Sequence, residues 1–209
     1  MIARRDKTHG VVRSRPDREL AVGSVVRWRV WLAIVVLLGF TREAALAQEV
    51  VDPRLEYNVK AVSLYAFGRY VTWPESAFPS AESPFVIGTM GGNPFGDALQ
   101  RIAQKKKLNG RPIVVRQIKG SEDAGDCHIV FVTRSVSGDD EKQLFEFAAG
   151  KPVLLVGESP GFASRGGVIN FYHSGGTVRF ELNPDKSLES QLSLNAKLLT
   201  LGTRATKRQ

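Results

Sequence analysis

The chain has 209 residues, of which 43% are hydrophobic and 24% are charged, a composition typical of an ordinary globular protein with one domain. Its formal net charge of +8 suggests nucleic acid as a partner, but residues 1–47 carry nine basic and four acidic side chains. The remaining 20 basic and 17 acidic residues give a net charge of only +3, which removes the main support for nucleic-acid binding.

Residues 1–47 have the pattern of a targeting segment. Arg27 and Arg29 precede an apolar run of eleven residues, Val30–Phe40, and Ala45-Leu46-Ala47 fits a small-x-small cleavage site before Gln48. The run is shorter than the roughly 20 residues of a normal membrane span. We predict a cleaved signal peptide over 1–47 and an exported domain over 48–209, with an uncleaved anchor as the alternative.

The exported part begins with a predicted helix over Arg54–Thr72, which ends there because Pro74 disfavours helical backbone at the residue before it. Short apolar runs then predict strands at 84–90, 111–118, 127–133 and 151–158. Between and after them, helices are predicted at 94–107, 139–150 and 187–202.

A late hairpin is predicted over 166–183, because His173-Ser174-Gly175-Gly176 is a turn signal between two alternating segments. Buried strands that alternate with helices indicate a mostly parallel sheet. We therefore expect an α/β fold, a single sandwich domain with a mostly parallel sheet, a late antiparallel hairpin and helices on both faces.

The most specific catalytic pattern is Gly157-Glu158-Ser159-Pro160-Gly161, a G-x-S-x-G sequence directly after a buried strand. Two features argue against a hydrolase. Pro160 lacks the backbone N–H that an oxyanion hole needs after the serine, and no histidine follows Asp185 to complete the order Ser-Asp-His. A turn that closes the strand is the favoured interpretation.

No cofactor or metal site is predicted. The segment 91–96, GGNPFG, lacks the Lys-Ser/Thr that completes a phosphate-binding loop. His128 and His173 are far apart in sequence and no carboxylates cluster with them. Cys127 is the only cysteine, so an intrachain disulfide is excluded. A core position is the favoured interpretation, and an intermolecular bridge or a redox role is the alternative.

The helix over 54–72 carries two apolar stripes on nearly opposite faces. Their members are Leu55, Val59, Val62, Ala66 and Tyr70 on one stripe, and Tyr57, Ala61, Leu64, Gly68 and Val71 on the other. One stripe can pack on the sheet, whereas the other needs a cover: the helix at 187–202, a second subunit or a partner protein. The residues that we expect to form a partner-binding surface are Tyr57, Lys60, Leu64, Phe67, Tyr70 and Trp73.

From about Tyr57 to Leu201 the chain resembles the YfiR family of periplasmic regulators. The resemblance is carried, in order, by VKAVSLYAFGRYVTWP, FVIGTMGGNPFGDAL, LNGRPIVV, CHIVFVTRS, PVLLVGESPGFASRGGVINF, VRFELN and LSLNAKLLTLG. Each piece alone is weak, but seven pieces in this order and spacing form a specific signal.

The resemblance implies a periplasmic, non-enzymatic repressor that binds the periplasmic part of an inner-membrane diguanylate cyclase, lowering cyclic di-GMP and biofilm formation. It also implies a homodimer, and release through an outer-membrane-linked partner. The alternative hypothesis is a periplasmic small-molecule sensor domain that acts on a membrane kinase or transporter. In that case the turn-rich segment Gly161–Gly167, with Phe162, would border the ligand pocket.

Overall fold

The computed structural model describes residues 53–205, which belong to one compact unit. The predicted signal peptide over 1–47 lies outside the described residues, and no described helix has the length and apolar character needed to cross a membrane. The elements, in chain order, are α2 Pro53–Tyr70, β1 Val71–Thr72, η1 Glu75–Ala77, β2 Phe85–Met90, α3 Ala98–Lys105, β3 Lys107–Leu108, β4 Arg111–Ile118, η2 Ser121–Asp126, β5 Ile129–Val132, α4 Gly138–Ala148, β6 Leu154–Gly157, α5 Phe162–Arg165, β7 Ile169–Ser174, β8 Thr177–Leu182, α6 Pro184–Glu189, β9 Ser193–Leu194, α7 Ala196–Leu201 and β10 Thr203–Arg204.

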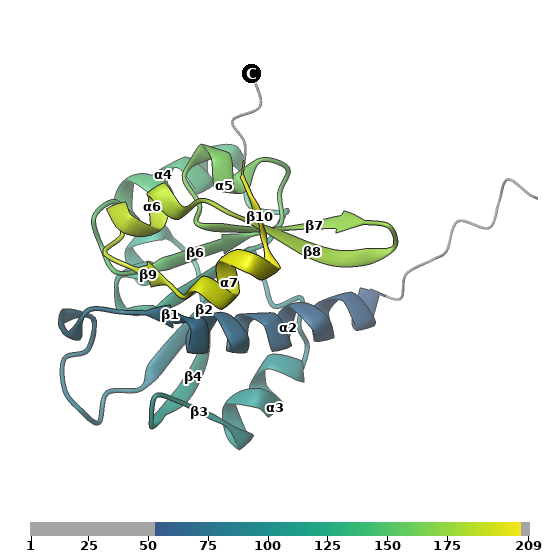
Figure 1. Ribbon diagram of the computed structural model, residues 1–209. Coiled ribbons are helices and arrows are strands. Elements are labelled where there is room, and N and C mark those ends of the chain that lie inside the picture. Colours follow the sequence, from purple (N-terminus) through teal and green to yellow (C-terminus); the bar gives the residue numbers. More distant parts are fainter. Residues whose placement is uncertain (1–52, 206–209) are drawn as a thin grey trace, which may run out of the picture. The chain divides into compact units, whose positions relative to one another are not determined.

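An eight-stranded sheet forms the centre of the domain, in the order β10-β8-β7-β6-β5-β2-β4-β3 (Figure 1). Its central pairs, β4/β2, β2/β5, β5/β6 and β6/β7, are all parallel. The β7/β8 hairpin is antiparallel and turns at Gly175-Gly176, where both residues have positive φ. These findings confirm the predicted mostly parallel sheet with a late hairpin.

Alternate residues of the central strands face two separate apolar cores. Ile129 and Phe131 of β5 pack in the core that also contains Leu64 of α2, whereas Val130 and Val132 pack in the core that contains Leu144 of α4. A strand that is apolar on both faces needs cover on both faces. The predicted sandwich with helices on both sides of the sheet is therefore confirmed.

Only one apolar stripe of α2 packs on the sheet. Ala61 and Leu64 are fully buried, and Gly68 lies so close to β3 that a Cβ atom there would be 2.5 Å from Leu108 Cδ1. Leu55 and Val62, on the opposite stripe, are 62% and 60% exposed. The helix thus lies against the core on one side and presents apolar side chains to solvent on the other.

The predicted closing helix over 187–202 is wrong as a single element. The segment instead forms α6, strand β9 and α7, and β9 pairs antiparallel with β1. Gln191 has positive φ, and the Asn195 side chain accepts a hydrogen bond from the Lys197 N–H, so a new helix starts there. Pairing with the strand that follows α2 outweighs the helical periodicity of the leucines.

The start of α3 also differs from the prediction, which placed it at Pro94 with Asn93 as its N-cap. Residues 94–97 form turns, and the helix begins at Ala98. The Asn93 side chain accepts from the Phe95 N–H at 3.1 Å and donates to the Gly96 carbonyl at 3.1 Å. Asn93 therefore stabilises a tight turn before the helix.

Cys127 and His128 directly precede β5 and are buried. The buried position of Cys127 agrees with the core interpretation, and burial, as the largest influence, raises the pKa of its thiol. The His128 ring accepts from the Val86 N–H through Nδ1 at 3.0 Å, and its Nε2 lies 3.1 Å from the Ala77 carbonyl oxygen. Burial lowers the pKa of His128 to about 4.

This buried neutral imidazole predicts a loss of stability in acid. An unfolded chain binds the His128 proton near pH 6.5, whereas the folded chain binds it only near pH 4. The stabilising contribution is therefore complete above pH 6.5 and decreases as the pH falls toward 4, by up to about 3 kcal/mol. Urea unfolding of the wild type and of His128→Asn, from pH 7 to pH 4, measures it. We expect the difference in the free energy of unfolding between the wild type and His128→Asn to shrink by that amount. A difference that stays constant from pH 7 to pH 4 would contradict a buried, neutral His128.

Candidate functional site

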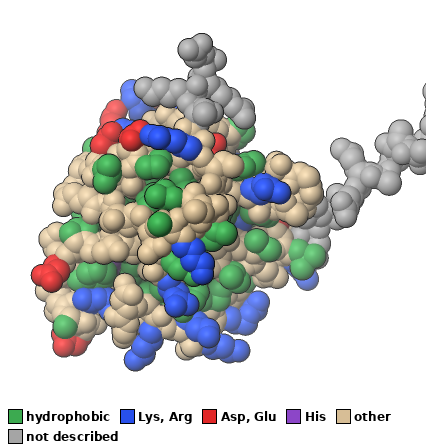
Figure 2. All heavy atoms as spheres, in the orientation of Figure 1, with side chains coloured by type: hydrophobic (Ala, Val, Ile, Leu, Met, Phe, Trp, Pro, Cys, Tyr) green, Lys and Arg blue, Asp and Glu red, His purple; other side chains and the backbone are tan. Residues whose placement is uncertain are grey.

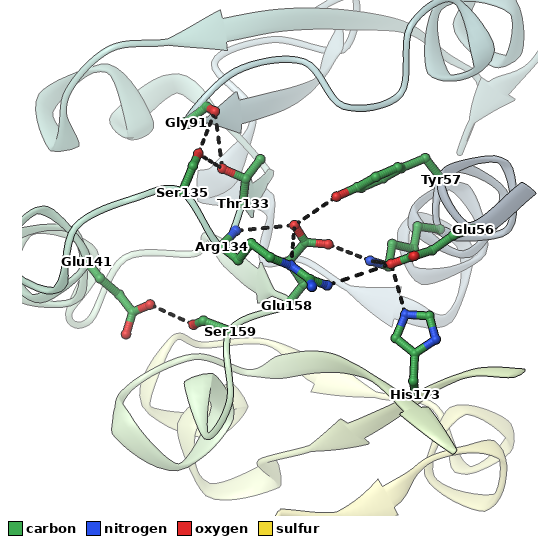
Figure 3. Close-up of polar contacts among 11 residues, drawn as sticks. Glu56, Tyr57, Gly91, Thr133, Arg134, Ser135, Glu141, Glu158, Ser159 and His173 are labelled. Carbon is green, nitrogen blue, oxygen red and sulfur yellow. Dashed lines mark hydrogen bonds and ion pairs between the residues drawn. The ribbon is translucent and has the colours of Figure 1, made fainter. Parts of the chain in front are cut away.

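A cluster of charged side chains lies where β5, β6 and β7 end, beside the first half of α2 (Figure 3). Arg134 follows β5, Glu158 follows β6, and His173 belongs to the last part of β7. Helix α2 contributes Glu56 and Lys60, which are one helical turn apart. Parallel strands bring their carboxyl ends to one edge of a sheet, which is where α/β domains commonly place functional groups.

Lys60 is at the centre of the cluster and is 1% exposed. Its ammonium group contacts the carboxylates of Glu56 and Glu158, and it also lies 4.6 Å from the ring centroid of Tyr57. A buried ammonium group is tolerated only when it is paired and hydrogen-bonded. The two carboxylates meet that requirement and connect α2 to the end of β6.

Glu158 has several donors for its buried carboxylate. Its Oε1 accepts from the Tyr57 hydroxyl at 3.1 Å and from the Arg134 backbone N–H at 3.2 Å, while Oε2 accepts from Lys60. Burial first, and then the charge of Glu158, raise the pKa of Tyr57 to about 12. Tyr57 therefore remains a neutral hydrogen-bond donor at any physiological pH.

Glu56 links the cluster to the β7/β8 hairpin. Its Oε1 lies 3.0 Å from His173 Nε2 and 3.8 Å from an Arg134 guanidinium nitrogen. Burial by itself raises the pKa of Glu56, but the hydrogen bonds and charges of Lys60 and His173 outweigh it and hold that pKa below its usual value. Glu56 is thus charged at neutral pH and joins α2, β5 and β7.

The serine of the G-x-S-x-G pattern is engaged in a separate contact set. The Ser159 hydroxyl donates to a Glu141 carboxylate oxygen at 3.0 Å and accepts from Arg165 at 2.9 Å. Arg165 also donates through Nε to Glu141 at 2.7 Å. These bonds connect the turn after β6 to α4, so the turn interpretation of the motif agrees with the geometry.

The six residues predicted to form a partner-binding surface do not form an exposed one. Four of them are buried, namely Lys60, Leu64, Phe67 and Trp73. The other two, Tyr57 and Tyr70, are half-buried against the core. The expectation of exposure is wrong because Lys60, Leu64 and Phe67 lie on the side of α2 that faces the sheet. Trp73, which follows α2, is buried in the same core as Leu64. Phe67, for example, contacts the rings of Phe171 and Phe180 at centroid distances of 5.6 and 5.1 Å. Direct partner contact through these side chains stays a prediction.

Sequence reasoning missed the charged cluster because its members come from four separate segments. Two local signals were present: Glu56 and Lys60 have the i,i+4 spacing of a helical ion pair, and Glu158 directly follows an apolar strand. Neither signal indicates that α2 lies across the ends of β5 and β6. Arg134 and His173 carried no local signal.

The fold and site define an α/β domain whose charged cluster connects its elements to one another and whose first helix exposes an apolar face. Within residues 53–205, no group of His, Cys, Asp and Glu side chains has the arrangement of a metal site.

The chain belongs to the DUF4154 family, described as YfiR/HmsC-like, whose model matches residues 57–203. The predicted resemblance to the YfiR family is thereby confirmed. The family is one of periplasmic regulators linked to diguanylate cyclases. No curated protein matches the chain.

Proposed function

We propose that the protein is an exported, non-enzymatic repressor that binds the periplasmic part of an inner-membrane diguanylate cyclase. Binding would hold the cyclase in its inactive arrangement, which requires higher affinity for that arrangement than for the active one. Lower cyclic di-GMP and less biofilm would follow. The family resemblance extends the proposal to a homodimer, and to an outer-membrane-linked protein that relieves the repression.

The observation that supports this proposal most is the exposed apolar stripe of α2, formed by Leu55, Val59 and Val62. These side chains are 62%, 49% and 60% exposed and follow one another at helical spacing. Such a stripe on a helix is suited to protein contact. Figure 2 shows hydrophobic side chains together with Lys and Arg side chains over the part of the surface that α2, α3 and α7 occupy.

Helix α7 lies over the C-terminal end of α2, where Tyr70 is the last residue. Leu198 of α7 is buried in the same core as Leu64, and the Asn195 N–H donates to the Tyr70 carbonyl oxygen at 2.9 Å. The stripe at the opposite end of α2 is exposed within residues 53–205, and its expected cover is a second subunit or a partner protein.

The test is cellular cyclic di-GMP after deletion of the gene and restoration with variants. We expect deletion to raise cyclic di-GMP and the wild type to restore it. Val59→Glu/Val62→Glu should fail to restore it, because two buried carboxylates in the contact would weaken binding by at least about tenfold. Leu188→Glu, at a 71% exposed leucine on α6, is the matched control and should restore repression.

Immunoblots of the periplasmic fraction would confirm that each variant accumulates to the same level. Repression by Val59→Glu/Val62→Glu equal to that of the wild type would remove the stripe from the contact. Unchanged cyclic di-GMP after deletion would contradict the cyclase as the partner.

A further inference from the structure

A groove of about 780 Å³ lies beside the charged cluster, at the same carboxyl edge of the sheet. Its lining comes from the ends of β5 and β6, from the Pro160-Gly161 turn, and from α5, β7, β8 and β10. Volumes of this size are typical of small-molecule sites, and this edge is where doubly wound sheets bind ligands. Gly161 borders the groove, whereas Phe162 is fully buried in the core.

The charged lining favours an anion. Arg134, Arg165 and Arg204 line the groove together with His173. Arg165 is engaged with Glu141 and Ser159, but Arg134 reaches its carboxylate partners only at 3.7 and 3.8 Å. The Arg204 side chain is 70% exposed, and its Nη2 donates to the two carboxylate oxygens of Asp185 at 3.3 and 3.5 Å, which leaves its other N–H groups available. Both guanidinium groups keep donors for a bound carboxylate or phosphate.

The acidic side chains of the lining do not cancel this charge. Glu158 already has Lys60 as a buried counter-ion, and its side chain is 1% exposed. Glu181 accepts a hydrogen bond from Asn170 Nδ2 at 3.0 Å and is half-buried. The exposed charges of the lining are therefore mainly positive. Hydrogen-bond acceptors, the amide oxygen of Asn170 and the carboxylate of Glu181, lie in another part of the lining.

Asn170 supplies a second, independent indication of a ligand. The residue lines the groove and is 2% exposed, and its Oδ1 has no hydrogen-bond partner among the described residues. A buried amide oxygen without a donor is costly, and few such atoms occur in folded proteins. A hydroxyl or amino group of a bound molecule would supply the missing donor.

We propose that this groove binds a small organic anion that also carries a hydroxyl or amino group. Arg134 and Arg204 hold the anionic group, and Asn170 Oδ1 accepts from the donor group. The site lies between the β7/β8 hairpin, the turn after β6 and the end of β5. Its volume accommodates a molecule of a few carbon atoms.

The groove shares Arg134 and His173 with the cluster that holds Glu56 of α2. A bound anion competes with Glu56 for these two cations, so occupancy alters the contacts of the helix that bears the exposed stripe. This link to regulation rests on the proposed function, because it assumes that α2 contacts the cyclase.

The test is a ¹⁵N–¹H NMR titration of the purified protein with four probes: malate, aspartate, succinate and inorganic phosphate. Malate and aspartate have the donor group that succinate lacks. We expect saturable shifts for malate or aspartate at groove residues, and at least about tenfold weaker binding of succinate. Arg134→Gln and Arg204→Gln should each weaken binding about tenfold. Arg101→Gln, which removes an exposed arginine of α3, is the charge-matched control and should bind as the wild type does.

The absence of saturable shifts with all four probes up to about 10 mM, which corresponds to very weak affinity, would overturn the proposal. Equal binding of malate, aspartate and succinate would overturn the role of Asn170. If Arg101→Gln weakened binding as much as Arg204→Gln does, the attraction would be a nonspecific effect of charge, and the proposal would also be overturned. The titration contains no cyclase, so its failure is distinguishable from failure of the repression assay.

Discussion

Lys60→Met is expected to destabilise the protein by about 3–5 kcal/mol, because it leaves the buried carboxylate of Glu158 without its counter-ion. Glu158 is 1% exposed in its side chain and would retain only the Tyr57 and Arg134 N–H donors, with the Arg134 guanidinium at 3.7 Å. Methionine has nearly the length of lysine, so the substitution removes charge with little change in packing volume. Urea unfolding at pH 7 measures the loss.

Two further proteins make the result specific to the buried pair. Lys60→Met/Glu158→Gln should recover at least half of the loss, because the amide oxygen can still accept from Tyr57 while the unpaired charge is gone. Lys142→Met, in an exposed pair with Glu146 at 3.9 Å, should cost less than about 0.5 kcal/mol. A loss below about 1 kcal/mol in Lys60→Met would mean that the cluster contributes no more than a surface ion pair.

Leu64→Glu is expected to prevent stable folding. Leu64 is fully buried among the apolar side chains of the core between α2 and the sheet. The loss combines the transfer term of a leucine, about 2–5 kcal/mol, with the cost of burying an unpaired charge. The sum approaches the whole stability of a typical domain. Circular dichroism and thermal unfolding would detect it.

Val62→Glu is the matched control, since it places the same charge on the same helix two residues away. Val62 is 60% exposed, so the expected change is within about 0.5 kcal/mol. The two variants therefore decide which stripe of α2 is free for a partner. Equal stability of Leu64→Glu and wild type would contradict the packing of α2 on the sheet.

This contrast has a direct consequence for functional assays. A variant such as Leu64→Glu or Phe67→Glu would lose repression through unfolding, and the result would resemble loss of a contact surface. Val59→Glu/Val62→Glu changes the exposed stripe and leaves the buried face of α2 intact. Only variants of the exposed kind distinguish partner binding from folding.

Much of the architecture was predictable because it depends on local patterns. Continuous apolar runs such as 84–90 and 111–118 predicted buried strands, and Gly175-Gly176 predicted the hairpin turn. The closing segment was the exception. Its leucines have helical spacing, but Ser193-Leu194 pairs with Val71-Thr72, a contact between segments that no local pattern reveals.

The fold class, the family and the two apolar stripes of α2 could all be inferred from the sequence. Which of the two stripes is buried depends on how α2 packs in the folded domain. Periodicity gives the angle between side chains on a helix, but not the direction in which the sheet lies, and here the sheet lies under Ala61 and Leu64. The charged cluster and the groove likewise required the parallel strands to bring Arg134, Glu158 and His173 to one edge, because residues so distant in sequence meet only through the register of the sheet.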